Sequence, residues 1–254
     1  MRYRACIFCL ALVFMAGGFS LLSCRAEKAG TLGTQESGFS AAEPEDIAGG
    51  YSAGSAMLIN VEEKPDFILL SYRDPAMSNW VTAFFRDLCG SHEIAVLILS
   101  NAAEFGVSPA LAFSLCWEES RYNPRALNRN RNGTVDRGLF QLNNASFPNL
   151  KVEDFYDPAI NVRYGMAHLR WCLDDAGTEV AALAMYNAGH NRVRSAGTPK
   201  STLDYVSRIL RRQRRIEELF IAEYMRITEA ESAEAEEKEK SFFRFSLLTP
   251  LGRR

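Results

Sequence analysis

Residues 108–124 read SPALAFSLCWEESRYNP, and this stretch indicates how the surrounding chain folds. Ser108-Pro109 is a typical helix start, because a serine hydroxyl can cap the first turn and proline fits the first helical position. Leu115 and Cys116 fall on one face of the predicted helix, and Glu119 follows Leu115 by four positions. The spacing therefore predicts a helix whose apolar stripe carries a carboxyl group.

Helix signals of the same kind occur before and after this stretch. Capping residues followed by helical periodicity mark the expected starts, which are Asp74-Pro75, His92, Asp157-Pro158, Thr178 and Ser201. Gly90 and Gly177 can end two of these helices, while strand signals are almost absent. The sequence therefore predicts one compact, mostly α domain over about residues 66–227.

Composition limits the classes of partner. Hydrophobic residues make up 47% of the 254-residue chain and charged residues 24%, as in packed globular proteins. Lys and Arg together number 29 against 31 Asp and Glu, so no overall positive field favours nucleic acid. We therefore expect a locally recognised partner and no binding of nucleic acid.

The first residues indicate an export signal. Two arginines precede an apolar run over residues 5–22, which ends in Leu-Leu-Ser before Cys24. This ending resembles a bacterial lipobox, so residues 1–23 are interpreted as a lipoprotein signal peptide and Cys24 as the site of lipid attachment. An uncleaved membrane anchor is the alternative. Either interpretation predicts that the chain lies outside the cytoplasm. With the lipid anchor we expect it in the bacterial cell envelope, facing the periplasm, with the outer membrane favoured over the inner.

Two further segments lie outside the predicted domain. Residues 24–65 are rich in Gly, Ser, Ala and Glu without an apolar period, and they are interpreted as a flexible, lipid-anchored linker. Residues 228–254 form a C-terminal tail that is first charged and then apolar. Three cysteines, Cys89, Cys116 and Cys172, remain in the mature domain, and their sequence is compatible with one disulfide or with three buried thiols.

Glu119 is the candidate catalytic residue. A carboxyl group donates a proton near neutral pH only if its pKa is raised, and an apolar setting raises it. The neighbouring Glu118 is turned by about 100° on the helix, so we expect it to be exposed. Position alone would favour a solvated carboxylate at a helix end, because most carboxylates on helices are solvated.

The segments around Glu119 favour the catalytic interpretation. They are ESRYNPRA at 119–126, GLFQLN at 138–143, DPAINV at 157–162, YNAG at 186–189 and Tyr205-Val206. In this order and spacing they resemble motifs of the lytic transglycosylase (SLT) family with a lysozyme-like fold, glycoside hydrolase family twenty-three. The goose-type lysozymes are distant relatives of that family. The resemblance covers about residues 94–215, and Phe140 departs from it because the family has Met there.

The resemblance implies a fold and a reaction. It implies a lysozyme-like helical domain that cleaves the β-1,4 bond between N-acetylmuramic acid and N-acetylglucosamine in peptidoglycan, leaving a 1,6-anhydromuramic product. Glu119 would act first as acid and then as base, and no second acid is marked in the motifs. The residues expected to bind or orient the glycan are Ser120, Phe140, Gln141, Tyr186, Asn187 and Tyr205, with the Phe140 ring forming an apolar wall of the cleft.

The same interpretation sets the expected partners. They are peptidoglycan strands, the membrane through the lipid anchor, and envelope or secretion machinery, because the Asn-rich loop LNRNRNGTVDR at 127–137 is like that of a subgroup associated with secretion systems. Asn128, Asn130 and Asn132 copy the start of an EF-hand, but its twelfth position is Leu139 rather than Glu. We therefore expect a turn-rich loop, no metal and no cofactor. A hydrolytic muramidase and a non-catalytic glycan-binding scaffold are the alternative functions.

Overall fold

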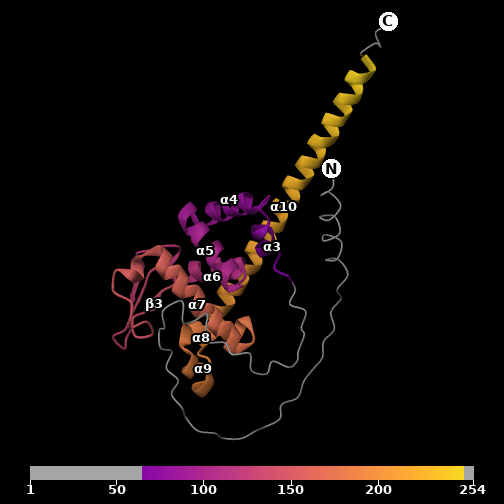
Figure 1. Ribbon diagram of the computed structural model, residues 1–254. Coiled ribbons are helices and arrows are strands. Elements are labelled where there is room, and N and C mark those ends of the chain that lie inside the picture. The colour runs from indigo at the N-terminus through magenta and orange to yellow at the C-terminus, as the bar shows by residue number, and fades with distance from the viewer. Residues whose placement is uncertain (1–64, 249–254) are drawn as a thin grey trace, which may run out of the picture. The chain divides into compact units, whose positions relative to one another are not determined.

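A computed structural model of the protein describes residues 65–248, with side chains described as far as residue 241. This part of the chain is mostly helical, as predicted, with one small sheet (Figure 1). The helices are α3 (Phe67–Arg73), α4 (Ser78–Cys89), α5 (His92–Phe105), α6 (Pro109–Ser120), the 3-10 helix η2 (Asp154–Tyr156), α7 (Pro158–Ala176), α8 (Glu179–Ala188), α9 (His190–Ala196) and α10 (Lys200–Leu248).

The N-terminal predictions lie outside this region. The signal peptide over residues 1–23, the lipid site Cys24 and all of the predicted linker except its last residue precede residue 65. Among the described helices, none is apolar over a stretch long enough to cross a bilayer.

Most helix boundaries follow the local signals in the sequence. The side chains of Ser108, Asp157 and Thr178 each accept a hydrogen bond from a backbone N–H in the first turn of α6, α7 and α8. Gly90 and Gly177 end α4 and α7 in the left-handed conformation. These starts and ends are confirmed.

The start predicted at Asp74-Pro75 is wrong by one turn. Asp74 instead follows α3, and its carboxylate accepts a hydrogen bond from the backbone N–H of Ala76, which closes a turn. Helix α4 begins only at Ser78. Helices α3 and α9 were not predicted because each is only seven residues long, too short to show a repeating apolar face.

A small antiparallel sheet follows α6. It consists of β1 (Leu127–Arg129), β2 (Val135–Arg137) and β3 (Leu142–Asn143) in the order β1-β2-β3. Its strands are two or three residues long, and polar side chains from the Asn-rich loop hold them together, so they lack the apolar alternation that predicts a strand. The sheet contacts α7 through β3.

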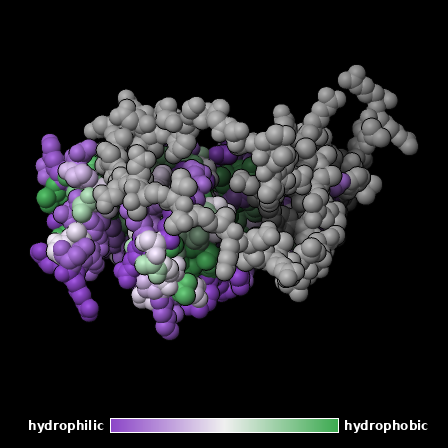
Figure 2. All heavy atoms as spheres, turned by 90° about the horizontal axis from the view of Figure 1, so that it is seen from below, coloured by the Kyte–Doolittle hydropathy of each residue, from purple (hydrophilic) through white to green (hydrophobic). Residues whose placement is uncertain are grey.

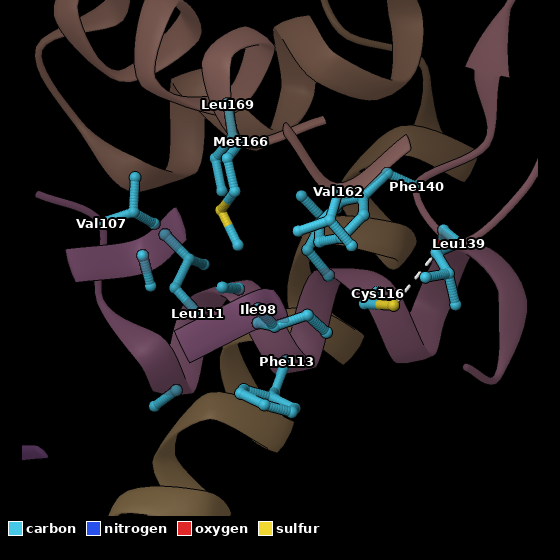
Figure 3. Close-up of a cluster of buried hydrophobic side chains, with 14 of the residues drawn as sticks. Ile98, Val107, Leu111, Phe113, Cys116, Leu139, Phe140, Val162, Met166 and Leu169 are labelled. Atoms are coloured by element: carbon cyan, nitrogen blue, oxygen red, sulfur yellow. Dashed lines mark hydrogen bonds between the residues drawn. The ribbon is translucent and has the colours of Figure 1, made fainter. Parts of the chain in front are cut away.

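The main core forms around α6. Helices α5, α7 and α10 pack against this element or its neighbours, and every residue from Pro109 to Cys116 is buried. Figure 3 shows Leu111 of α6 on the side of Met166 of α7, whereas the Phe113 ring points to the opposite side of α6, where it stacks on Phe85. The Cys116 thiol also donates to the backbone oxygen of Leu139 at 3.5 Å, which links α6 to the segment after β2 (Figure 3). Helix α6 is therefore a fixed support for the residues at its C-terminal end.

Helix α10 runs through the boundary predicted at Ile227. Its first part is buried at Tyr205, Ile209, Ile216 and Phe220, whereas the side chains of residues 229–241 are almost all exposed. Alanine, glutamate and lysine favour helix, and pairs such as Lys238 with Glu234 add support one turn apart. The predicted charged segment is thus a continuation of the same helix.

Hydrophilic residues cover most of the coloured surface in the view of Figure 2, with smaller hydrophobic areas between them. The three cysteines of the described residues, Cys89, Cys116 and Cys172, are free thiols, and the last two are buried. Of the two arrangements compatible with the sequence, the structure has unpaired thiols that pack as small apolar groups.

Candidate active site

Glu119 lies in the last turn of α6, one turn after the fully buried Leu115. The chain leaves the helix through Arg121 and Tyr122, whose φ angles of 57° and 60° are left-handed. Such angles are uncommon for residues with a Cβ atom. The Tyr122 hydroxyl donates to the backbone oxygen of Phe113 at 3.1 Å, so a buried hydrogen bond holds this turn. The end of α6 is therefore fixed at the position of Glu119.

The surroundings of Glu119 favour its protonated form. The residue is half-buried, and burial raises the pKa of its carboxyl group from 4.5 to about 8. A hydrogen bond from the Tyr205 hydroxyl to Oε1 of Glu119 lowers the pKa, while the negative charges of Asp136 and Glu118 raise it. The net result is a carboxyl group that still holds its proton near neutral pH and can donate it.

Two tyrosines from different helices share this environment. Tyr205 of α10 is buried and donates to Glu119, and the Tyr186 hydroxyl of α8 donates to the backbone oxygen of Phe140 at 2.9 Å. Burial, followed by the charge of Glu119, raises the pKa of both phenols well above 10. Both groups therefore remain neutral hydrogen-bond donors.

The expectation that Glu118 is exposed is wrong. Its side chain is only 12% exposed, and its Oε1 lies 2.7 Å from Nη2 of Arg208 on α10. The sequence places Glu118 and Glu119 on different faces of α6, which is correct, but α10 covers both faces. Glu118 thus forms an ion pair with an arginine, whereas Glu119 accepts a hydrogen bond from a tyrosine, so the two carboxyl groups have different surroundings.

The segment from Gly138 to Gln141 turns back on itself beside this site. Gln141 has a left-handed φ of 48°, and its Nε2 donates to the backbone oxygen of Gly138 at 2.9 Å. The buried Asn161 of α7 accepts from the Phe140 backbone N–H at 2.8 Å and donates to the backbone oxygens of Arg137 and Phe155. A buried amide thus fixes the backbone that carries Gln141.

The prediction that the Phe140 ring lines the cleft is wrong. Phe140 has no exposed surface, and its ring lies against Gly165 of α7, where a Cβ atom would come within 2.4 Å of the ring. The absence of a side chain at Gly165 lets the ring enter the core. Phe140 therefore acts at the site only through its backbone oxygen, which accepts from Tyr186.

The two remaining predicted residues, Ser120 and Asn187, form hydrogen bonds with neighbouring parts of the fold rather than with Glu119. The Ser120 hydroxyl is buried and donates to the backbone oxygen of Cys116, so its contact is with its own helix. The Asn187 side chain is exposed and accepts from the Thr202 hydroxyl at 2.9 Å, which joins the end of α8 to the start of α10. Among the described contacts, only Tyr205 bonds directly to Glu119.

Asp136 is the residue that the sequence analysis missed. Among neighbouring charges its charge contributes most to raising the pKa of Glu119, and it also raises the pKa of Tyr186, so the charge of Asp136 acts on both groups. The side-chain amides of Asn130 and Asn143 donate to its carboxylate at 2.8 and 2.6 Å. The signal in the sequence was weak, because Asp136 is merely the one acid of an Asn-rich loop.

The Asn-rich loop has the geometry of a hydrogen-bonded turn. Asn128 and Asn130 direct amide N–H groups toward Asp136, and the Asn132 oxygen accepts from the backbone of Thr134. Within the described part of the chain, no cluster of three or more His, Cys, Asp or Glu side chains could hold a metal ion.

Comparison with protein families identifies a known domain in the part of the chain that contains Glu119. Residues 96–207 match a family model described as the Transglycosylase SLT domain. The matched range contains Glu119, Asp136, Gln141 and Tyr205, which come from three different parts of the fold.

Two curated relatives are similar over part of their length. A transglycosylase of Enterobacteria phage PRD1 is 34% identical over 100 residues, which cover 39% of this chain and 36% of the relative. The invasion protein IagB of Salmonella typhimurium is 31% identical over 97 residues, which cover 36% of this chain and 61% of the relative. The chain thus spans less than two thirds of either relative.

Among solved structures, an inactive mutant of the lytic transglycosylase Slt from Pseudomonas aeruginosa is 22% identical, with a TM-score of 0.43. The similarity covers 50% of this chain and 24% of that chain. The match to the family model is the specific result, and through residues 96–207 the chain is similar to the Transglycosylase SLT domain.

Proposed function

We propose that the protein is a lytic transglycosylase with a lysozyme-like fold that cleaves the MurNAc–GlcNAc β-1,4 bond of peptidoglycan. The observation that carries this proposal is the hydrogen bond from the Tyr205 hydroxyl to Glu119, whose pKa burial raises to about 8, within residues that match the Transglycosylase SLT domain. Such a group can protonate the oxygen of a glycosidic bond at neutral pH.

The proposed reaction uses Glu119 twice. Its proton passes to the glycosidic oxygen as the bond from that oxygen to the muramyl anomeric carbon breaks. The C6 hydroxyl of the same muramyl unit then attacks this carbon, and the Glu119 carboxylate accepts the hydroxyl proton. The product is a 1,6-anhydro ring and Glu119 is again protonated, so one carboxyl group suffices, whereas ordinary glycosidases use two.

Tyr205 has a defined part in this cycle. Its hydroxyl donates to Glu119 and favours the ionised form, which is the form that must accept the second proton. Tyr186 and the Gly138–Gln141 segment form the adjoining wall, because the Tyr186 hydroxyl bonds to that segment. We propose that Gln141 and Asn187, which both keep exposed polar surface, contact the glycan.

A second function, a hydrolytic muramidase, is favoured by Asp136. Its charge acts on Glu119, and an enzyme that uses water often employs a second carboxylate to activate the water. The two functions differ in whether the C6 hydroxyl or water captures the sugar.

Mass spectrometry of the sugars released from purified peptidoglycan distinguishes these functions. The protein without its first 24 residues is expected to release anhydromuramyl ends, and a Glu119→Gln variant none. Reducing ends would show a muramidase instead. A folded parent protein that binds the strands but releases neither product would show a non-catalytic scaffold.

Removing the Tyr205 hydroxyl tests its effect on Glu119. Without that donor the ionised carboxylate is less stable, so the pKa of Glu119 rises further. Because the reaction begins with protonated Glu119, the alkaline limb of kcat/KM is expected to move up by about one pH unit in Tyr205→Phe. The pH profile of the purified variant measures this limb, and an unchanged limb would contradict the assigned hydrogen bond.

We also propose that the enzyme acts in the bacterial envelope, anchored by lipid at Cys24 and facing the periplasm, where it remodels the wall locally for envelope or secretion machinery. The lipobox-like ending of residues 1–23 supports the anchor, and the similarity to a protein named for invasion supports the role. Radiolabelled palmitate should enter the full-length protein but not a Cys24→Ser variant. Equal labelling of the two proteins would exclude Cys24.

A further inference from the structure

Trp117 of α6 lies between two arginines. The guanidinium of Arg121 stands 4.7 Å from the centre of the indole ring, and that of Arg212 on α10 stands 4.1 Å from it. Stacking on an aromatic face holds a guanidinium in place while its N–H groups stay free at the edge. Arg121 is exposed and Arg212 half-buried, so both can reach a ligand from solvent.

Neither of these positive charges forms an ion pair with the described residues, although the charge of Glu118 acts on Arg212. Among the described residues, no carboxylate lies within ion-pair distance of either Arg121 or Arg212. The acid next to them in the sequence, Glu118, is already paired with Arg208 at 2.7 Å. Two cations held around one ring repel each other, and an anion at the edge of the ring, near both, would relieve that repulsion.

Their position relates them to the catalytic acid. Successive contacts between α6 and α10 join Glu119 to Tyr205, Glu118 to Arg208 and Trp117 to Arg212, so the two helices run antiparallel here. Arg212 follows Tyr205 by seven residues, which corresponds to about 10 Å along a helix. Arg212 thus lies about two helical turns along α10 from the tyrosine that bonds to Glu119, and Arg121 follows Glu119 by two residues.

Peptidoglycan carries an anion at a suitable distance. A stem peptide leaves the muramyl unit next to the bond that Glu119 would cleave, and its acidic residues carry carboxylates. An extended peptide advances about 3.5 Å per residue, so its second or third residue reaches about 10 Å. Guanidinium groups bind carboxylates through two parallel hydrogen bonds, which suits this pair better than a single ammonium would.

We propose that Arg121 and Arg212, held by Trp117, bind a carboxylate of the stem peptide and make the enzyme selective for strands that carry stems. This inference rests on the proposed function, since it assumes that peptidoglycan occupies the site. It assigns the arginines to substrate recognition rather than to the chemical step.

Binding of soluble fragments tests the inference independently of turnover. Isothermal titration calorimetry would compare a GlcNAc–MurNAc disaccharide bearing its stem peptide with the same disaccharide lacking the peptide. The parent protein is expected to bind the first about tenfold more tightly, in line with one charge-assisted contact. A third ligand, whose stem carboxylates are converted to amides, should bind like the peptide-free disaccharide.

Variants locate the contact. In Arg121→Gln/Arg212→Gln the preference for the stem should disappear, while affinity for the peptide-free disaccharide stays unchanged. Arg86→Gln/Arg214→Gln removes the same charge from exposed positions and should keep the preference. Equal preference in the parent and the first variant would overturn the inference. So would a parent that binds all three ligands equally, whatever its activity, whereas loss of anhydro products alone would count only against the proposed function.

Discussion

Glu119→Gln is expected to lower kcat by about a hundred- to ten-thousand-fold, the usual contribution of a general acid. Glutamine has nearly the same shape, and its amide can still meet the Tyr205 hydroxyl, but it has no acidic proton for the glycosidic oxygen. Release of anhydromuramyl ends from purified peptidoglycan measures the loss. A variant within tenfold of the parent would show that another group, of which Asp136 is the nearest candidate, supplies the proton.

Measuring the stability of Glu119→Gln distinguishes a loss of catalysis from misfolding of the variant. The pKa of Glu119 is raised in the folded protein from 4.5 to about 8, so the folded state holds a proton that the unfolded state releases. Stability contributed by this group is therefore complete below pH 4.5 and is lost as the pH rises through about 8. Urea denaturation should show Glu119→Gln gaining stability relative to the parent between pH 5 and pH 8.5. The opposite sign would mean that the carboxyl group is not protonated at neutral pH.

The sequence predicts the parts of the site that depend on one helix. Ser108 caps α6, and helical spacing places Glu119 after the buried Leu115, because both features need only neighbouring residues. The family motifs likewise identify Tyr205 from an ordered series of short segments, although the spacing alone does not show that its hydroxyl meets Glu119.

What the sequence does not predict depends on contacts between distant residues. Glu118 is covered because Arg208 reaches it from α10, 90 residues away. Phe140 enters the core because Gly165 on another helix leaves room for its ring. The charge of Asp136 acts on Glu119 from β2 of the small sheet, which is a different element from α6. None of these partners leaves a periodic pattern that could be recognised in the chain.

Gly138→Ala should have the largest effect on stability. Gly138 has a φ of 78°, and a Cβ atom there would lie 2.2 Å from both the Phe155 backbone oxygen and the Asn161 amide nitrogen. The left-handed backbone costs a residue with a Cβ about 1–2 kcal/mol, and overpacking costs about 1–3 kcal/mol more. We therefore expect the free energy of unfolding, measured in urea, to fall by about 2–5 kcal/mol.

Gly133→Ala is the matched control, because it separates backbone strain from crowding. Gly133 lies in the Asn-rich loop that precedes Gly138, and it also has a left-handed φ, of 86°. A Cβ atom at Gly133, however, would have no neighbour within 4 Å. This variant should lose only the backbone contribution, about 1–2 kcal/mol, and should keep its activity. Gly138→Ala should also lose activity, because Asn161 and the Gly138 oxygen hold the segment that carries Gln141. Equal losses of stability in the two variants would show that the loop yields at Gly138, and that Asn161 does not fix the backbone beside Glu119.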